Sequence, residues 1–310
     1  MPFFGSCYLF NCWTNNHWNQ NLRCNVDDNY VSPFMNHIIN DYKFWNKSSG
    51  RNHFLIHPMD HQDDYYERKY LFQSAIYLTT IGDKRSVKSS EFRRNRNVVI
   101  PSATAILNSF KINPLDFINE DGNPNNRNTL VIFRGCCSNV KPNDYYSEGV
   151  RHLIFNGLNN LSGWDIGEGV NNDEYAKQLA GSKYGLAPSG WTLDTTRIWE
   201  YLAFGVVPIV IADGIIEPFE DDVDWDEFIV RVRRKDAHRL NEIITNIPDS
   251  EYKRKQEIVW KIGKTLTLGP FTWHYIARSL CRIWLNSVRC FSRSTSTSLV
   301  VPPVSGFLVV

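Results

Sequence analysis

The 310-residue sequence has no long apolar run and no excess of charge of either sign. Because no stretch of about 18 apolar residues occurs, no membrane-spanning helix is expected. The opening residues 1–5 lack the basic and apolar regions of a secretory signal. The formal net charge of +1 provides no strong field to hold nucleic acid or an anionic membrane. These absences favour a soluble, cytoplasmic protein that neither binds nucleic acid nor spans a membrane.

The cysteines, an odd number, lack the spacing of a zinc site. The seven cysteines are Cys7, Cys12, Cys24, Cys136, Cys137, Cys281 and Cys290. The first three could pair in an oxidising compartment, but without a signal peptide free thiols are favoured. The sequence does not decide whether any of them form disulfides.

Aromatic residues are abundant, at 14% with ten tryptophans. Flat rings stack on the apolar faces of sugars, although most such rings are expected in the core. The length suits two domains, and the polar segment 119–128 is the best linker candidate. We therefore expect domains at 1–122 and 129–268. A helix at 269–290 would pack back on the first domain, before a tail at 291–310.

The apolar pattern predicts alternating strands and helices. Strands are expected at 53–58, 98–101, 129–133, 182–188, 206–211 and 229–232. Helices are expected at 32–45, 65–78, 148–158, 174–180 and over most of 234–288. Alternation of this kind predicts an α/β fold, and nearly continuous apolar strands are typical of parallel sheets covered on both faces.

The segment 182–211 gives the strongest local pattern, a strand, a helix and a second strand that together form a βαβ unit. Asp194 or Thr195 can cap the helix, and Gly205 can end it. Since amides at a helix N-terminus attract phosphate, the loop 189–192 before this helix is expected to supply donors to a phosphate group.

Arg197 and Glu200 lie three residues apart on this helix and therefore share a face. The arginine could bind a diphosphate and the glutamate could accept from ribose hydroxyls of the same nucleotide. An ordinary salt bridge between the two is the alternative. Arg134, at the end of the strand 129–133, is a second candidate for the diphosphate, because open α/β sheets bind ligands beyond the carboxyl ends of their strands.

Several segments form a set of specific motifs: SKYGLAPSGW at 182–191, RIWE at 197–200, FGVVPIVIAD at 204–213 and Pro218-Phe219, with further matches at 32–60, at 99–101 and at Phe133-Arg134-Gly135. As a set they resemble the motifs of the exostosin-like inverting glycosyltransferases. The likeness covers residues 30–265. It is strongest toward the xylan xylosyltransferase branch, through Gly190-Trp191 and residues 209–213.

The resemblance implies a GT-B fold, in which two Rossmann-like domains face each other across a cleft. The acceptor would bind to residues 1–122 and the nucleotide-sugar donor to residues 129–268. It also implies transfer with inversion from a UDP-sugar, here UDP-xylose, to a glycan hydroxyl, with no metal and no other cofactor. The donor ligands would be Arg134, Ser189, Gly190, Trp191, Arg197 and Glu200. Most members of the family are anchored in the Golgi membrane, whereas no anchor or stem is expected from this sequence. A soluble, virus-encoded relative would differ from the family in the same way.

Inversion by a single displacement needs a general base for the acceptor hydroxyl. A polar cluster after the strand 53–58 suits that role, and its members are His57, Asp60, His61, Asp63 and Asp64. Asp60 matches an acidic position in the xylosyltransferase-like members and is our first choice, with His57 to orient or replace it. The alternatives are a solvated polar loop or a divalent-ion site.

Two other interpretations remain open at this stage. The donor could carry galactose, arabinose or glucuronic acid in place of xylose. The chain could also be a carbohydrate-binding partner protein that has lost turnover.

Overall fold

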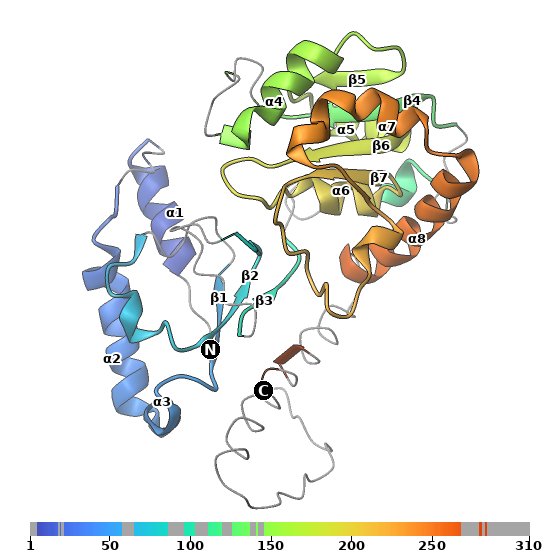
Figure 1. The fold of residues 1–310 in the computed structure, drawn as a ribbon. Helices are drawn as coiled ribbons and strands as arrows, with labels where there is room; N and C mark the ends of the chain where they lie inside the picture. Colours follow the sequence, from blue (N-terminus) through green and yellow to red (C-terminus); the bar gives the residue numbers. More distant parts are fainter. Residues whose placement is uncertain are drawn as a thin grey trace, which may run out of the picture.

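The computed structural model describes residues 5–17, 19, 22–57, 65–85, 96–102, 111–119, 126–136, 141, 146–267, 279–280 and 283. Its described part contains two all-parallel sheets, one of three strands and one of five. The blue and teal N-terminal residues build the smaller unit, and the green to orange residues build the larger one (Figure 1). The expected α/β fold with two parallel-sheet units is confirmed.

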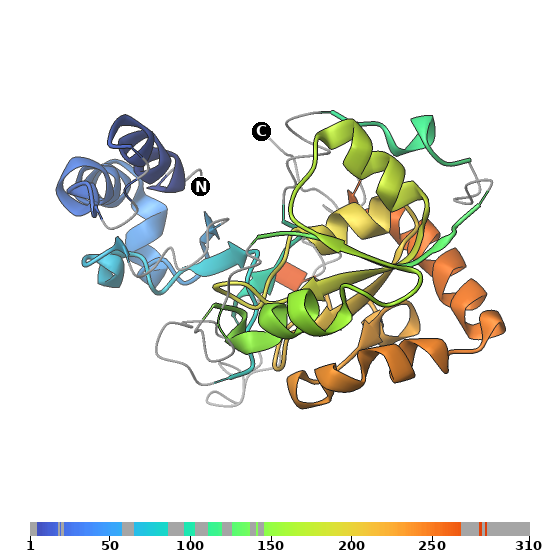
Figure 2. The same cartoon turned by 90° about the horizontal axis from the view of Figure 1, so that it is seen from above.

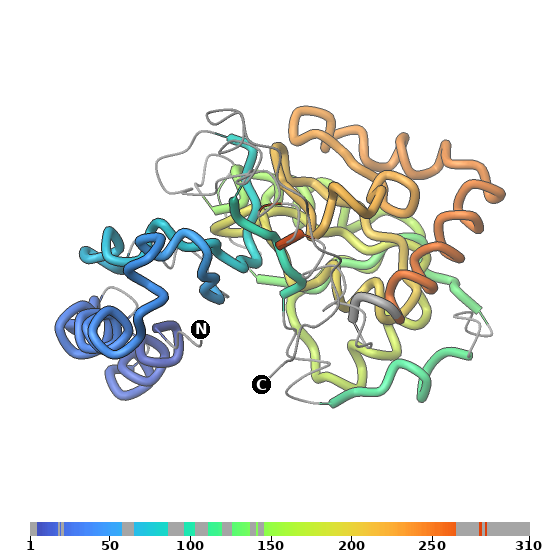
Figure 3. The backbone as a smooth tube through the Cα atoms, turned by 90° about the horizontal axis from the view of Figure 1, so that it is seen from below, coloured from blue at the N-terminus to red at the C-terminus, as the bar shows by residue number. Residues whose placement is uncertain are grey.

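The smaller sheet has the order β1-β2-β3. Its strands are β1 (Phe54–His57), β2 (Ile76–Thr79) and β3 (Val98–Val99). The helices beside it are α1 (Gly5–Asn15), α2 (Ser32–Asp41) and α3 (Lys43–Ser48). Side chains from these helices pack with Leu55 and Tyr77 of the sheet to form a separate apolar core. Figure 3 shows this unit beside the larger one.

Two of the helix predictions for this unit need correction. The single helix expected at 32–45 is broken at Tyr42, whose backbone is extended at φ −119° and ψ 109°. The helix expected at 65–78 is wrong. That segment holds the 3₁₀ turn Lys69–Leu71 and then β2, whose residues Ile76 to Leu78 are buried and pair in parallel with β1. Aromatic and β-branched residues suit such a strand.

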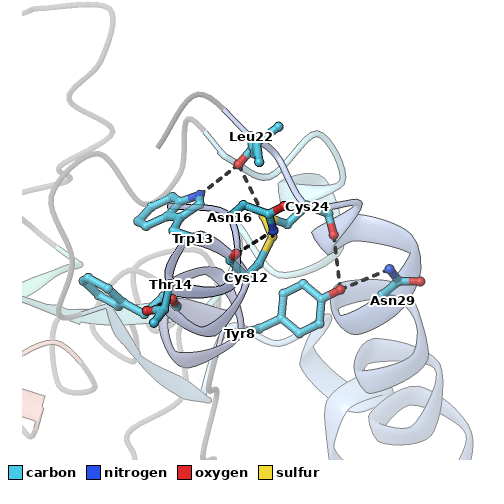
Figure 4. The surroundings of a disulfide bond; sticks show 9 residues. Tyr8, Cys12, Trp13, Thr14, Asn16, Leu22, Cys24 and Asn29 are labelled. Atoms are coloured by element: carbon cyan, nitrogen blue, oxygen red, sulfur yellow. Dashed lines mark hydrogen bonds between the residues drawn. A yellow bond between two sulfur atoms is a disulfide. The ribbon is translucent and has the colours of Figure 1, made fainter. Parts of the chain in front are cut away.

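The expectation of free thiols among the first three cysteines is confirmed for Cys7 and wrong for Cys12 and Cys24. Cys12 and Cys24 form a disulfide, with their Cα atoms 6.2 Å apart. Nearby, the Tyr8 hydroxyl donates to the Cys24 carbonyl at 3.1 Å (Figure 4). Cys136 is also disulfide-bonded, while Cys7 is a free, exposed thiol. The Cys12–Cys24 bond fixes the end of α1 to the segment that leads into α2.

The larger sheet has the order β5-β4-β6-β7-β8. Its strands are β4 (Thr129–Arg134), β5 (Trp164–Gly167), β6 (Ser182–Pro188), β7 (Val207–Ile211) and β8 (Val230–Arg231). Strand β5 was not predicted, and the other four lie where the apolar runs indicated. The order reverses between β4 and β6, which are neighbours in the sheet although β5 separates them in sequence.

Helices cover both faces of the larger sheet. They are α4 (Val150–Leu153, extended by π-helical Ile154–Leu158), α5 (Asn172–Ala180), α6 (Arg197–Ala203), α7 (Leu240–Thr245) and α8 (Asp249–Thr267). Right-handed crossovers place α4 on one face and α5 and α6 on the other, as Figure 2 shows. Within the described residues, no helix combines the length and apolar character needed to cross a bilayer.

The start of α6 differs from expectation. Neither Asp194 nor Thr195 caps it, since Thr196 occupies the N-cap position without a side-chain hydrogen bond. Asp194 instead accepts from the Ser102 hydroxyl at 2.5 Å. Gly205 follows the helix with φ 64°, a left-handed conformation that favours glycine, so its predicted role is confirmed.

The two units share backbone hydrogen bonds and part of one core. Asp83 and Ile215 form an antiparallel bridge, in which the Lys84 amide donates to the Gly214 carbonyl at 2.7 Å. Ile76, Leu78 and Val98 of the smaller sheet belong to the core of the larger one. Residues 120–125 of the expected linker, the base-candidate loop 58–64 and the expected tail 291–310 lie outside the described residues, as does most of 269–290. The domain boundaries therefore stay a prediction.

Candidate functional site

A cavity of about 660 Å³ opens at the carboxyl edge of the larger sheet. It is lined by Arg134, Gly135, Cys136, Glu168, Gly169, Val170, Tyr175, Thr196, Arg197 and Glu200. These residues follow β4 and β5 or lie on α5 and at the start of α6. The cavity therefore adjoins the point where the strand order reverses, the usual ligand position in open α/β sheets.

Arg197 is held at the rim of this cavity by the end of β4. Its Nε donates to the Arg134 carbonyl at 2.6 Å and its Nη1 to the Thr195 hydroxyl at 3.3 Å. The guanidinium carbon lies 5.1 Å from the centre of the Phe133 ring. Gly135 makes this approach possible, because a Cβ there would lie 2.7 Å from the Arg197 Nη2.

Glu200 lies one turn further along α6 and is only 8% exposed. Its Oε2 accepts a hydrogen bond from the Tyr175 hydroxyl at 2.8 Å. Burial raises the pKa of the Glu200 carboxyl, while the Tyr175 hydrogen bond and the charge of Arg197 partly oppose the rise. Both Glu200 and Arg197 belong to the described residues, and no ion pair joins them. The simple salt bridge considered as an alternative is therefore not formed.

Arg134 lines the same cavity but is already bound by neighbours. Its side chain, 12% exposed, forms an ion pair with Asp165 of β5, and its Nε donates to the Gln178 amide oxygen at 2.9 Å. Gly167 gives it room, since a Cβ there would lie 2.5 Å from the Arg134 Nη1. The positive charge of Arg134 is thus partly compensated within the protein.

The loop that carries Ser189, Gly190 and Trp191 does not line this cavity. The Ser189 amide donates to the Ile211 carbonyl and the Gly190 amide to the Thr192 carbonyl, at 3.1 and 3.0 Å. These two amides are therefore engaged within the protein in this structure. Trp191 is 62% exposed and packs at a tilt against Tyr146, with ring centres 5.1 Å apart.

Two residues of this region were missed from the sequence. Tyr175 is the hydrogen-bond donor to Glu200, and burial raises its pKa well above the ordinary value. Arg151 of α4 is buried and donates to the carbonyls of Ser189 and Cys136. Neither position belongs to a sequence motif, and only the fold brings the two residues to the edge of the sheet.

His57, the described member of the predicted base cluster, ends β1 and is buried. Its ring stacks on Tyr77 with centres 4.1 Å apart and meets Tyr66 and Phe72 edge-on. It does not line the cavity. Asp60, His61, Asp63 and Asp64 lie outside the described residues.

A second cavity, of about 1170 Å³, lies beyond β7 and β8, and Lys84 of the smaller unit contributes to its lining. Glu217, close in sequence to several lining residues, is fully buried. Burial raises the pKa of its carboxyl to about 8, against the opposing effect of Arg231, whose Nη1 is 3.4 Å away. A neutral carboxylic acid is therefore favoured here near neutral pH.

The parallel sheet, its reversal of strand order and the polar cavity beside it define a doubly wound α/β unit with a ligand site at its carboxyl edge. Residues 1–247 match the family model described as the Exostosin GT47 domain, and the chain belongs to this family.

Two of the relatives that this chain resembles come from plants. A probable glucuronosyltransferase of Oryza sativa subsp. japonica is 29% identical over 236 residues, which cover 72% of this chain and 53% of the relative. The probable β-1,4-xylosyltransferase IRX10 of Arabidopsis thaliana is 28% identical over 231 residues, 72% of this chain and 54% of the relative. The chain spans about half the length of the curated relatives it matches.

The matches among solved structures are more distant. Anabaena Alr3699/HepE in complex with UDP-glucose has a TM-score of 0.40 and 10% identity, covering 77% of this chain and 72% of that one. A glycosyltransferase from Rickettsia africae has a TM-score of 0.38 and 11% identity, covering 84% and 68%.

Proposed function

We propose that this protein is an inverting glycosyltransferase that transfers xylose from UDP-xylose to a hydroxyl group of a glycan. The observation that carries the proposal is that Arg197 and Glu200 line one cavity beside the reversal of strand order, in a chain of the exostosin family. The guanidinium would bind the diphosphate and stabilise it as it leaves. The Glu200 carboxylate, oriented by Tyr175, would accept from the ribose hydroxyls.

Arg134 has a supporting role in this proposal. Because its side chain is bound to Asp165 and Gln178, it would contribute charge to the cavity without moving. Its carbonyl also holds Arg197 in place. The loop with Ser189, Gly190 and Trp191 would contact the donor only after a rearrangement of its internal hydrogen bonds.

The transferred sugar is the least constrained part of the proposal. UDP-xylose is favoured by the motifs 190–191 and 209–213, and one relative is named as a xylosyltransferase. Other relatives are named as glucuronosyltransferases, which keeps UDP-glucuronic acid as the principal alternative donor. Galactose and arabinose are further candidates.

We assign the general base to Asp60, with His57 as the group that orients it, and we propose that no metal is needed. The burial of His57 among aromatic rings favours an orienting role over direct contact with the acceptor. In D60N, turnover should fall at least 100-fold while UDP affinity stays within twofold, since a positioned base contributes about 10²–10⁴-fold. Near-normal turnover in D60N would remove Asp60 from this role.

The first experiment is incubation of the protein with a panel of UDP-sugars and a xylan oligosaccharide acceptor, with release of UDP as the signal. We expect release from UDP-xylose, strongly reduced in R197Q and in E200Q. R254Q is the matched control, because Arg254 is an exposed residue of α8 that pairs with Glu251 and Glu227 and does not line the cavity. UDP binding without release from any donor would instead favour a non-catalytic carbohydrate-binding protein.

A further inference from the structure

Arg151 is a buried arginine without an acidic partner among the described residues. It is 4% exposed, lies on α4 and does not line the cavity. Its Nη1 donates to the Cys136 carbonyl at 2.6 Å and its Nε to the Ser189 carbonyl at 3.2 Å. Burial, followed by the charge of Arg197, lowers its pKa to about 10, so the group still carries its charge at neutral pH.

Arg151 and Arg197 share one aromatic ring. The two guanidinium carbons lie 5.6 Å and 5.1 Å from the centre of Phe133, which is itself fully buried. The hydrogen bonds of both arginines go to carbonyl or hydroxyl oxygens, and no ion pair compensates either charge within the described residues. Buried, unpaired charge of one sign is costly, and an anion bound at Arg197 would offset that cost.

The hydrogen bonds of Arg151 also join the ends of β4 and β6, the two strands between which the strand order reverses. Cys136 follows β4 and lines the cavity, whereas Ser189 follows β6 and begins the loop with Gly190. A second bond supports this connection, because the Ser147 amide donates to the Gly190 carbonyl at 2.9 Å. One side chain thus bridges the segments that follow both strands beside the site.

We propose that Arg151 is a positioning residue for the donor diphosphate. It fixes the ends of β4 and β6 and adds, behind Arg197, a positive charge that a diphosphate offsets and a neutral nucleoside does not. This inference rests on the proposed function, since it concerns the same nucleotide site.

The test compares the affinities of UDP and of uridine, which carries no phosphate, by calorimetry and ligand-observed NMR. In R151Q, and in R151M, which keeps an apolar stem beside Phe133, the preference for UDP over uridine should fall about tenfold, or about 1.4 kcal/mol. R151K keeps the charge and should retain that preference within threefold. R254Q again serves as the control.

Equal losses for UDP and uridine in R151Q or R151M would show a merely structural role and overturn the inference. An unchanged preference for UDP in either variant would also overturn it. If the unaltered protein bound no UDP, the proposed function itself would fail, which distinguishes the two failures. Because R151M retains packing that R151Q loses, the comparison remains decisive if only one of the two variants folds.

Discussion

Gly135 offers a sharp test of the idea that Arg197 must lie against the end of β4. A Cβ at this position would lie 2.7 Å from the Arg197 Nη2 and 2.8 Å from the Phe133 Cζ. The Phe133 ring is fully buried and cannot withdraw, so the arginine has to move. In G135A the hydrogen bond from the Arg197 Nε to the Arg134 carbonyl should therefore break or lengthen.

The expected magnitude follows from two contributions. Overpacking of a tight site costs about 1–3 kcal/mol, and a hydrogen bond to a charged group contributes about 1.5–3 kcal/mol. If half of about 3 kcal/mol appears as lost binding free energy, UDP affinity falls by about tenfold. The melting temperature should drop by only a few degrees, because the clash is local.

The assay is calorimetric titration of UDP into G135A, with thermal unfolding to verify the fold. G157A is the matched control, since a Cβ at Gly157 would meet nothing within 4 Å. We expect its UDP affinity to stay within twofold of the unaltered protein. An unchanged UDP affinity in G135A would refute the placement of Arg197 as a donor ligand held by this glycine.

Three further predictions concern other groups. In Y175F the Glu200 carboxyl loses the hydrogen bond that lowers its pKa, so the pH below which UDP binding weakens should rise. An unchanged midpoint in a titration of UDP affinity against pH would contradict this. Because the folded-state pKa of Glu217 is raised from 4.5 to about 8, the folded protein binds the extra proton and its stability should fall as pH rises from about 5 to 8. Measured by urea unfolding, the stability of E217Q should fall less with rising pH than that of the unaltered protein. An equal dependence on pH in the two proteins would count against the raised pKa of Glu217. C12S should lose about 2–3 kcal/mol of unfolding free energy in urea, whereas C7S, which removes a free exposed thiol, should lose almost none.

Much of the larger unit could be predicted from sequence because its strands are apolar on both faces. The runs that became β6 and β7 are almost wholly buried, and the centre of β4, Val131 to Phe133, is buried as well. Strand β5 lacks that signal, since only Trp164 of its four residues is buried. The helix prediction for 65–78 failed because the aromatic residues of this segment fit a helix as well as a loop and a strand. Only the pairing with β1 decides between these structures.

The site was predictable where its residues are close in sequence. Arg197 and Glu200 share a helix face because three residues separate them. The Tyr175 hydroxyl reaches Glu200 across a separation of 25 residues, and Arg134 is occupied by Asp165 from 31 residues away. Contacts between residues so far apart in the sequence depend on the strand order, which no local pattern reveals.

The core shared between the two sheets has a consequence for how the chain can be divided. Ile76, Leu78 and Val98 are buried partly against the larger unit, and the Lys84 amide is bonded to the Gly214 carbonyl. A protein cut near residue 126 would expose the surface that these side chains cover and would lose the backbone bridge. Chimaeras that exchange the first 125 residues with those of a relative should therefore fold well only when the facing residues around Gly214 to Ile216 are exchanged with them.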